Sequence, residues 1–195
     1  MLGRDSHSSD RPGTLYIWLM ASDPSAARLP VVHLIEGPVG AGKSTYARAL
    51  AAEQRAVWLN LDDWYARLYR ADRPEAFVLE WYVERKARCH AQILRVTRSL
   101  VDAGTDVVVE LGLIQRAARE SFYAEIDGLP CELRVYVLDA PEKTRRARVQ
   151  SRNAERSDTF SIEIPDAVFD MASRMWEAPD EHEMKERRVS SVRTG

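Results

Sequence analysis

The stretch EGPVGAGKST, residues 36–45, restricts the possible folds of this chain more than any other part of the sequence. It matches the pattern G-x-x-x-x-G-K-[S/T] with Gly37, Gly42, Lys43 and Ser44. An apolar, β-rich run precedes it directly and a helix-forming segment follows it directly. Because this pattern works only between a strand and a helix, the stretch predicts a buried β-strand, a phosphate-binding loop and an α-helix in that order.

The loop also predicts which groups hold a nucleotide. Consecutive backbone N–H groups and the positive end of the helix dipole can neutralise phosphate charge without burying unpaired cations. We expect Lys43 to reach the β and γ phosphates and the Ser44 hydroxyl to ligate Mg²⁺, so ATP and Mg²⁺ are the expected cofactors. The residues expected to contact the nucleotide are Gly37, Pro38, Val39, Gly40, Ala41, Gly42, Lys43, Ser44 and Thr45. The alternative interpretation is a glycine-rich turn followed by Lys and Ser by chance.

Strand-like and helix-like segments alternate along the rest of the chain. The expected strands are the runs at residues 31–37, 56–63, 105–112 and 131–141. The expected helices lie at residues 44–54, 75–103, 119–128, 142–156 and 166–176. This alternation predicts an α/β fold, a three-layer α/β/α sandwich with a mostly parallel sheet, as in the P-loop NTPases. Ligands of such sheets bind at the carboxyl ends of the strands.

Composition indicates one globular domain in the cytoplasm. The chain has 195 residues, of which 45% are hydrophobic and 30% charged, which suits one core rather than two. Its two cysteines, Cys89 and Cys131, provide neither a disulfide framework nor metal-ligand spacing, so a reducing compartment is expected. The apolar run at residues 15–21 is too short to cross a membrane, and no membrane partner is expected.

Two adjacent acids, Asp62 and Asp63, close the second expected strand in the stretch LNLDDW. A carboxylate at this strand end can orient a hydroxyl nucleophile opposite the γ-phosphate and accept its proton. We interpret one of them as this general base and the other as a helix N-cap; the alternative is that both are only caps. The sequence lacks the guanine-reading Asn-Lys-x-Asp of switch GTPases, and the third strand ends in Glu110 alone rather than in paired acids. The pattern therefore favours phosphotransfer over a GTPase switch or a motor ATPase.

The order of these motifs resembles small bacterial P-loop kinases: chloramphenicol phosphotransferase, the zeta-toxin sugar-nucleotide kinases and the 5′-kinase domain of polynucleotide kinase. The resemblance covers residues 31–183 and rests on the loop, LDD, VVVE, LDAPEKTRRARVQSR and WEAPDEHE. It implies a nucleotide kinase-like fold in which Asp62 is the general base. It also implies that arginines after Leu-Asp-Ala-Pro close over the phosphates, at Arg148, Arg152 and Arg156.

Two observations argue against a nucleic-acid partner. The formal net charge is −2, so the chain carries no global positive field. The polynucleotide kinases have an arginine three residues after the first aspartate, whereas this chain has Tyr65 there and Arg67 two positions later. The sequence therefore favours a small molecule as the acceptor.

The arginines that follow the fourth strand fit a lid on chemical grounds as well. A mobile arginine supplies a permanent charge and planar donors to the transferring phosphoryl group when the site closes. We expect Arg152 first and Arg148 second to contact phosphate; the alternative is a solvated basic helix face. Residues 30–195 are thus expected to form a P-loop kinase domain with a lid around residues 145–160. Residues 1–29 are interpreted as a partly disordered leader; the alternative is that residues 16–19 dock on the body as an extra strand or bind a partner.

The sequence identifies the acceptor-binding residues less specifically than the nucleotide-binding loop. Candidate acceptor contacts are Asp63, Trp64, Tyr65, Glu110, Arg116 and Arg119. The aromatic side chains wall a pocket or belong to the core, and the arginines bind an anionic acceptor or cover a helix surface. Glu110 holds a Mg²⁺-bound water, hydrogen-bonds the acceptor or caps a loop.

The combined pattern predicts an enzyme, an ATP- and Mg²⁺-dependent phosphotransferase that moves the γ-phosphate to a hydroxyl of a small molecule such as a metabolite or antibiotic. A nucleoside, nucleotide or toxin-type sugar-nucleotide kinase is the nearest alternative. A nucleotide-binding regulatory module with little turnover, in which Asp62 is only a cap, is an alternative of another class.

Overall fold

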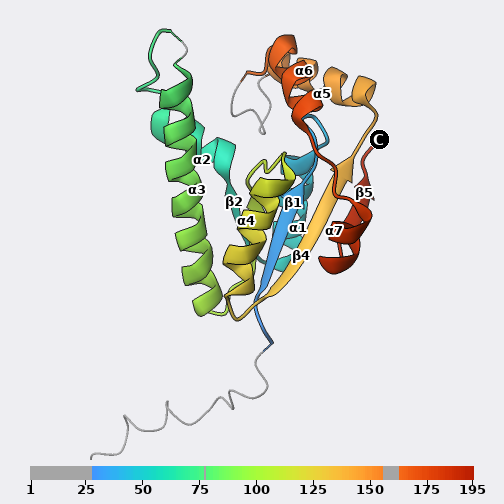
Figure 1. Cartoon of the computed structure of the whole chain (residues 1–195). Coiled ribbons are helices and arrows are strands. Elements are labelled where there is room, and N and C mark those ends of the chain that lie inside the picture. The colour runs from blue at the N-terminus through green and yellow to red at the C-terminus, as the bar shows by residue number, and fades with distance from the viewer. Residues whose placement is uncertain (1–27, 77, 156–162) are drawn as a thin grey trace, which may run out of the picture.

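A computed structural model describes residues 28–76, 78–155 and 163–195 (Figure 1). All but the last two residues of the expected leader lie outside these ranges, as do Arg156 and the end of the expected lid. Among the helices of the described ranges, none is both long enough and apolar enough to cross a bilayer.

A parallel sheet forms the centre of the molecule and confirms the predicted fold class. Its strand order is β2-β3-β1-β4-β5, and every neighbouring pair is parallel. The strands are β1 (Val31–Glu36), β2 (Val57–Asn60), β3 (Val107–Glu110), β4 (Glu132–Asp139) and β5 (Ser190–Arg193). The first four match expected strands. β5 was not predicted, because its sequence SSVR is short, polar and mostly exposed, as befits an edge strand.

Seven helices connect and cover the strands of the described residues. They are α1 (Lys43–Gln54), α2 (Leu61–Tyr69), α3 (Leu79–Asp102), α4 (Arg116–Asp127), α5 (Glu142–Glu155), α6 (Asp166–Met175) and α7 (Glu181–Glu186). Of α2, the sequence predicted only a cap at Asp62 or Asp63, because this helix is short and follows β2 without a loop. α7 was not predicted, since it has only six residues. The other five lie close to the expected segments.

Alternating side chains of the strands divide the core into two layers. Val32 and Leu34 of β1 pack on one face, which α3 and α4 cover with residues such as Ile93 and Phe122. Ile35 of β1 faces the opposite way, against α1. Figure 1 shows α3 and α4 on one side of the strands and α1 on the other. The result is the predicted three-layer sandwich.

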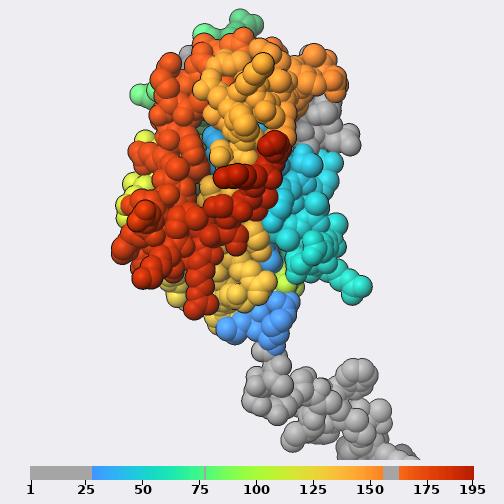
Figure 2. All heavy atoms as spheres, turned by 90° about the vertical axis from the view of Figure 1, so that its right-hand side faces the viewer, coloured from blue at the N-terminus to red at the C-terminus, as the bar shows by residue number. Residues whose placement is uncertain are grey.

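The carboxyl ends of the strands meet at one edge of the sheet. Asn60 at the end of β2 lies opposite Glu110 at the end of β3, and Glu36 ends the central strand β1. In Figure 1 this edge is the upper one, near α2, α5 and α6. Figure 2 shows the C-terminal residues lying on the surface against those of β4 and α5.

Candidate active site

The loop between β1 and α1 has the geometry of a phosphate cradle. Gly37, Gly40 and Gly42 all have positive φ, between 78° and 142°. A Cβ atom on Gly40 would lie 2.5 Å from the carbonyl oxygen of Arg145, and one on Gly37 would collide with the carbonyl oxygen of Leu138. Glycine is therefore required at these two positions by both conformation and space, and the residues present fit a bound phosphate group.

Lys43 is held inside its own loop. Its Nζ donates hydrogen bonds to the carbonyl oxygens of Gly37, at 2.8 Å, and Pro38, at 3.0 Å. Partial removal from water lowers the pKa of Lys43, although the carboxylates of Glu110 and Glu36 oppose this effect. The ammonium thus lies between the loop and the acidic strand ends.

Ser44, Glu110 and Asn60 form a hydrogen-bonded chain beside the loop. The Ser44 hydroxyl donates to Glu110 Oε1 at 2.8 Å, and Asn60 Nδ2 donates to Glu110 Oε2 at 2.6 Å. Burial raises the pKa of Glu110, while Lys43 and these hydrogen bonds oppose the shift. A hydroxyl and a carboxylate are ligands that Mg²⁺ accepts, so this pair fits the expected ion, and the metal role of Glu110 remains a prediction.

The prediction that Asp62 closes β2 is wrong, because the strand ends at Asn60. Asp62 lies in the first turn of α2. The N-cap is Asn60, whose Oδ1 accepts from the backbone N–H of Asp63 at 2.8 Å; the expectation that one aspartate is the cap is therefore wrong. The Asp62 side chain is 57% exposed and its Oδ1 lies 3.0 Å from Lys86 Nζ. Partial burial raises its pKa, but Lys86, Lys43 and Arg152 more than offset this and lower it.

The other acceptor candidates of α2 are occupied elsewhere. Asp63 pairs with Arg67 of the same helix at 2.8 Å. Trp64 is partly buried and packs against the core of the α3 and α4 face. Tyr65 is buried among the rings of Tyr69, Trp81 and Tyr82, which corrects the prediction that it lines an acceptor pocket. The aromatic residues of α2 thus pack the α2–α3 contact.

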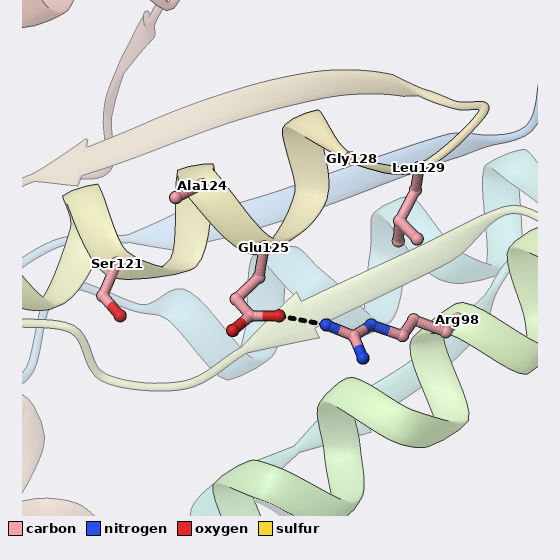
Figure 3. Close-up of a pocket in the computed structure, with 6 residues that line it drawn as sticks. All are labelled: Arg98, Ser121, Ala124, Glu125, Gly128 and Leu129. Carbon is pink, nitrogen blue, oxygen red and sulfur yellow. Dashed lines mark hydrogen bonds and ion pairs between the residues drawn. The ribbon is translucent and has the colours of Figure 1, made fainter.

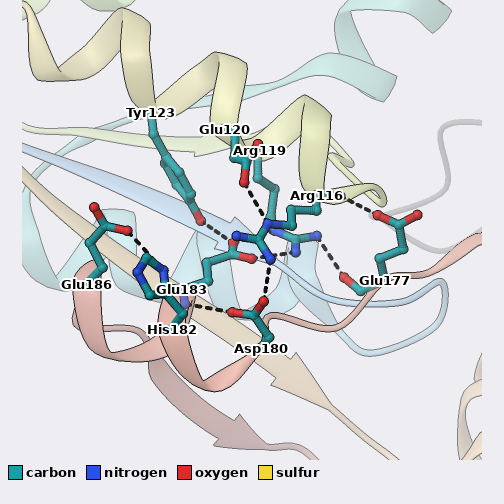
Figure 4. Close-up of polar contacts among 9 residues, drawn as sticks. All are labelled: Arg116, Arg119, Glu120, Tyr123, Glu177, Asp180, His182, Glu183 and Glu186. Carbon is teal, nitrogen blue, oxygen red and sulfur yellow. Dashed lines mark hydrogen bonds and ion pairs between the residues drawn. The ribbon is translucent and has the colours of Figure 1, made fainter.

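The prediction that Arg119 binds an anionic acceptor is wrong, because its side chain is 0% exposed. Its Nε and Nη2 donate to the two carboxylate oxygens of Glu183, at 2.6 and 2.8 Å, and Nη1 donates to the Glu177 carbonyl. Figure 4 shows this cluster between α4 and the C-terminal segment. Arg116 pairs with Glu120 and Asp180 but stays exposed, so its contact with an acceptor remains a prediction. Both arginines fasten α4 to the segment that leads into α7.

The arginines of α5 separate into different roles. Arg145 is buried and donates to the carbonyl oxygen of Val39 in the loop at 3.0 Å, so it supports the loop from behind. Arg146 pairs with Asp170 of α6. Arg148 donates to the hydroxyl and carbonyl oxygens of Thr194. Its predicted contact with phosphate remains a prediction.

Arg152 differs from these three. Its Nε and Nη2 are buried and have no hydrogen-bond partner among the described residues. Burial lowers its pKa, opposed by the carboxylates of Asp62 and Glu110. An unpaired buried guanidinium is costly, so this group faces the acids without the hydrogen bonds that an anion would supply.

Sequence reasoning missed two ionisable residues of this site. Glu36 is 0% exposed and neither oxygen has a hydrogen-bond partner among the described residues; burial raises its pKa to about 8, against the opposing charges of Lys43 and Arg119. No sequence signal distinguishes it from an ordinary residue before a loop.

For Lys86, the other missed residue, the sequence does contain a signal. The apolar stripe of α3 runs through Tyr82, Cys89, Ile93, Val96 and Leu100. Lys86 stands four residues after Tyr82 and three before Cys89, so a lysine occupies a position on the buried face.

A surface pocket of about 520 Å³ lies elsewhere on the molecule (Figure 3). Its lining residues are Arg98, Ser121, Ala124, Glu125, Gly128 and Leu129. They come from the later part of α3, the later part of α4 and the turn that follows it, which returns toward the amino ends of the strands. None of the predicted site residues lines this pocket.

Comparison with known proteins agrees with this geometry. The sequence profile of the AAA domain family AAA_33 matches residues 32–179. Among curated proteins, none matches the chain.

Several solved structures share the fold at low sequence identity. A gluconokinase from Sinorhizobium meliloti 1021 is similar with a TM-score of 0.55 and 18% identity, over 85% of this chain and 83% of that chain. Kti12 from Chaetomium thermophilum, in complex with ADP-AlF3, is similar with a TM-score of 0.61 and 18% identity, over 83% and 88% of the two chains.

A chain of the Pnkp1/Rnl/Hen1 RNA repair complex is similar with a TM-score of 0.59 and 18% identity, over 80% of this chain. The present chain spans only 46% of the length of that protein. From the profile match and the shared fold, we conclude that the chain belongs to the AAA domain family AAA_33 and has the nucleotide-binding fold of the small P-loop kinases.

Proposed function

We propose that this protein transfers the γ-phosphate of ATP, with Mg²⁺, to a hydroxyl group of a small molecule in the cytoplasm. The observation that carries the proposal is the convergence of Lys43, Asp62 and Arg152 at one sheet edge, where both cations lower the pKa of Asp62 and its carboxylate raises theirs against the effect of burial. A carboxylate base, a phosphate-binding lysine and an unpaired arginine beside a phosphate cradle are the groups that phosphoryl transfer needs. The free thiols of Cys89 and Cys131 are consistent with a reducing compartment.

The residues of the loop bind and orient the donor. Its backbone N–H groups hold the phosphates, and Lys43 exchanges the carbonyl oxygens of Gly37 and Pro38 for phosphate oxygens. Ser44 and Glu110 would hold Mg²⁺, the first through its hydroxyl and the second through its carboxylate or a bound water. The bound ion supplies charge neutralisation at the phosphates.

Asp62 acts on the acceptor. Its carboxylate accepts the proton of the acceptor hydroxyl while that oxygen forms a bond to the γ-phosphorus and the bond between this phosphorus and the β–γ bridging oxygen breaks. ADP leaves with the electron pair of the broken bond. Arg152 donates to the oxygens on which negative charge accumulates, which gives its unpaired N–H groups a partner.

The acceptor class is open to a direct experiment. Because a gluconokinase shares the fold, sugars and sugar acids come first in a panel, followed by nucleosides, nucleotides, sugar nucleotides and antibiotics with free hydroxyls. The wild-type protein is incubated with Mg²⁺ and ATP labelled at the γ-phosphate, and labelled products are separated. Tight ATP binding without a labelled product in the whole panel would favour the regulatory module over the kinase.

Asp62→Asn tests the role of the base. The variant keeps size and hydrogen bonding but cannot accept the proton, so we expect kcat to fall by about 10²- to 10⁴-fold with ATP affinity nearly unchanged. Asp63→Asn is the matched control, because the neighbouring acid pairs with Arg67. Normal turnover of Asp62→Asn, or an equal loss in Asp63→Asn, would remove Asp62 from the proposed role.

A further inference from the structure

Among the described residues, Lys86 forms an ion pair with Asp62. It lies on α3, whereas Asp62 lies on α2, and its Nζ is 3.0 Å from Asp62 Oδ1. The same Nζ lies 5.4 Å from the centre of the Tyr82 ring, one helical turn earlier. The Lys86 side chain is only 29% exposed. An aromatic face and a carboxylate thus confine the ammonium on two sides.

This placement needs an explanation, because a lysine on the apolar stripe of a helix loses hydration. Burial alone lowers the pKa of Lys86, yet Asp62 and Tyr82 more than offset it, and the net shift is upward. The lysine therefore stays charged beside Asp62. Replacing it with an apolar residue would suit the stripe better for packing alone, so its charge points to a role at Asp62.

The charges around Asp62 come from several elements. Lys86 approaches from α3, Lys43 from α1 and Arg152 from α5, and the carboxylate of Glu110 approaches from β3. Of these groups, all within the described residues, only Lys86 forms an ion pair with an oxygen of Asp62. Lys43 and Arg152 are the groups that the donor phosphates would engage. Lys86 is thus the cation that remains with Asp62 when nucleotide binds.

We propose that Lys86 is a positioning residue, which holds Asp62 Oδ1 so that Oδ2 is presented, ionised, to the acceptor hydroxyl. This inference rests on the proposed phosphotransferase function. In this proposal the base depends on two helices, because Asp62 lies on α2 and Lys86, which orients its carboxylate, lies on α3.

Kinetics of Lys86→Met test the positioning role with an acceptor found in the panel. We expect kcat to fall about 10-fold or more, with the KM for ATP changed less than about 2-fold. Activity needs ionised Asp62, so it is lost as pH falls through the pKa of Asp62. Without Lys86 that pKa rises, and the acid limb of the pH profile moves to higher pH. Lys86→Arg, which keeps the charge, should restore most of kcat.

Two further variants make the test specific. Arg88→Met removes one positive charge from the exposed side of the same helix, where Arg88 pairs with Glu84, and should leave kcat and the acid limb unchanged. In an Asp62→Asn background, Lys86→Met should cause no additional loss, because its effect acts through Asp62. A changed KM with unchanged kcat and acid limb, or an equal loss in both backgrounds, would overturn the proposal.

A measurement independent of turnover separates this inference from the proposed function. The carboxyl ¹³C resonance of Asp62, followed by NMR against pH, should titrate at higher pH in Lys86→Met, or in Lys86→Gln if the former does not fold. An unchanged titration would refute the role of Lys86 even if the wild type is an active kinase. A shifted titration with no labelled acceptor would support the pairing while the proposed function fails.

Discussion

At Gly40 the loop leaves no room for a single added carbon atom, because the backbone of α5 passes directly behind it. The same helix then sends Arg145 to the carbonyl oxygen of Val39. The shape of the phosphate cradle is therefore determined partly by a helix about one hundred residues later in the chain. At the scale of single residues, glycine supplies the space and arginine supplies the support.

Gly40→Ala should weaken ATP binding by more than 10-fold and destabilise the fold by about 1–3 kcal/mol. The new Cβ would lie 2.5 Å from the Arg145 carbonyl oxygen, and φ is +78°. Isothermal titration and urea unfolding measure the two effects.

Gly104→Ala is the matched control for Gly40→Ala. Gly104 has φ +71° but no heavy atom within 4 Å of the added Cβ, so it shows the backbone strain without the collision. We expect a smaller loss of stability in this variant and unchanged ATP binding. Equal effects in both variants would show that strain alone, and not contact with α5, limits the loop.

At the scale of elements, the C-terminal segment stabilises α4. The Glu177 carboxylate accepts from the first backbone N–H of α4, that of Arg116, at 2.7 Å, and Glu183 of α7 pairs with buried Arg119. Tyr123 also donates to Glu183 Oε1, at 2.9 Å. The positive end of this helix, which would otherwise suit an anionic ligand, is filled by the protein itself.

Arg119→Met should destabilise the protein by about 3–5 kcal/mol, because it leaves the Glu183 carboxylate buried without its partner. Urea unfolding of the full chain measures this. Arg116→Met removes an exposed arginine with two carboxylate partners and should cause a much smaller change. If the two substitutions cost the same, the Arg119–Glu183 pair does not hold α7 in place.

Local patterns were sufficient for most elements but not for their junctions. The loop motif and the apolar runs predicted β1, β3, β4 and α1, because each carries its own period or motif. The β2–α2 junction was misplaced, since the Asn60 cap is a single side-chain hydrogen bond rather than a pattern. The partners of Arg119 lie about sixty residues away, and burial of an arginine against a distant glutamate has no local signature.

At the scale of the whole molecule, the sheet edge collects ionisable groups whose hydration is reduced by folding. Glu36, Lys43, Glu110 and Arg152 all have pKa values displaced by burial in the direction of the neutral form. At a pH where these groups would be charged in water, the displaced pKa values lower the free energy of unfolding. The site therefore makes the free energy of unfolding depend on pH.

The raised pKa of Glu36 determines the direction in which the free energy of unfolding changes with pH. Its pKa is raised to about 8 in the folded chain from an ordinary value of 4.5, so the folded state binds the proton more tightly. Its contribution to stability is complete below pH 4.5 and is lost as pH rises from there to about 8, by about 1.4 kcal/mol per pH unit at most. Glu36→Gln should remove this decline.

Urea unfolding at pH 5, 6, 7 and 8 compares the two proteins. The stability of Glu36→Gln relative to wild type should increase with pH across this range. A constant difference would show that Glu36 titrates normally in the folded protein. Glu132→Gln is the control, because this exposed acid lies on the same sheet but far from the loop.

Two nitrogens of Arg152, Nε and Nη2, are buried without a hydrogen-bond partner in the described part of the chain, and this has a consequence for how anions are accepted. The N–H groups of these two nitrogens lose their water when the chain folds, not when a ligand arrives. In the proposed function, an incoming phosphate would therefore meet donors that have already lost their water, so the site would be preorganised for negative charge. Neutral molecules of the same shape would gain nothing from this group, and the proposed site would discriminate between ligands by charge.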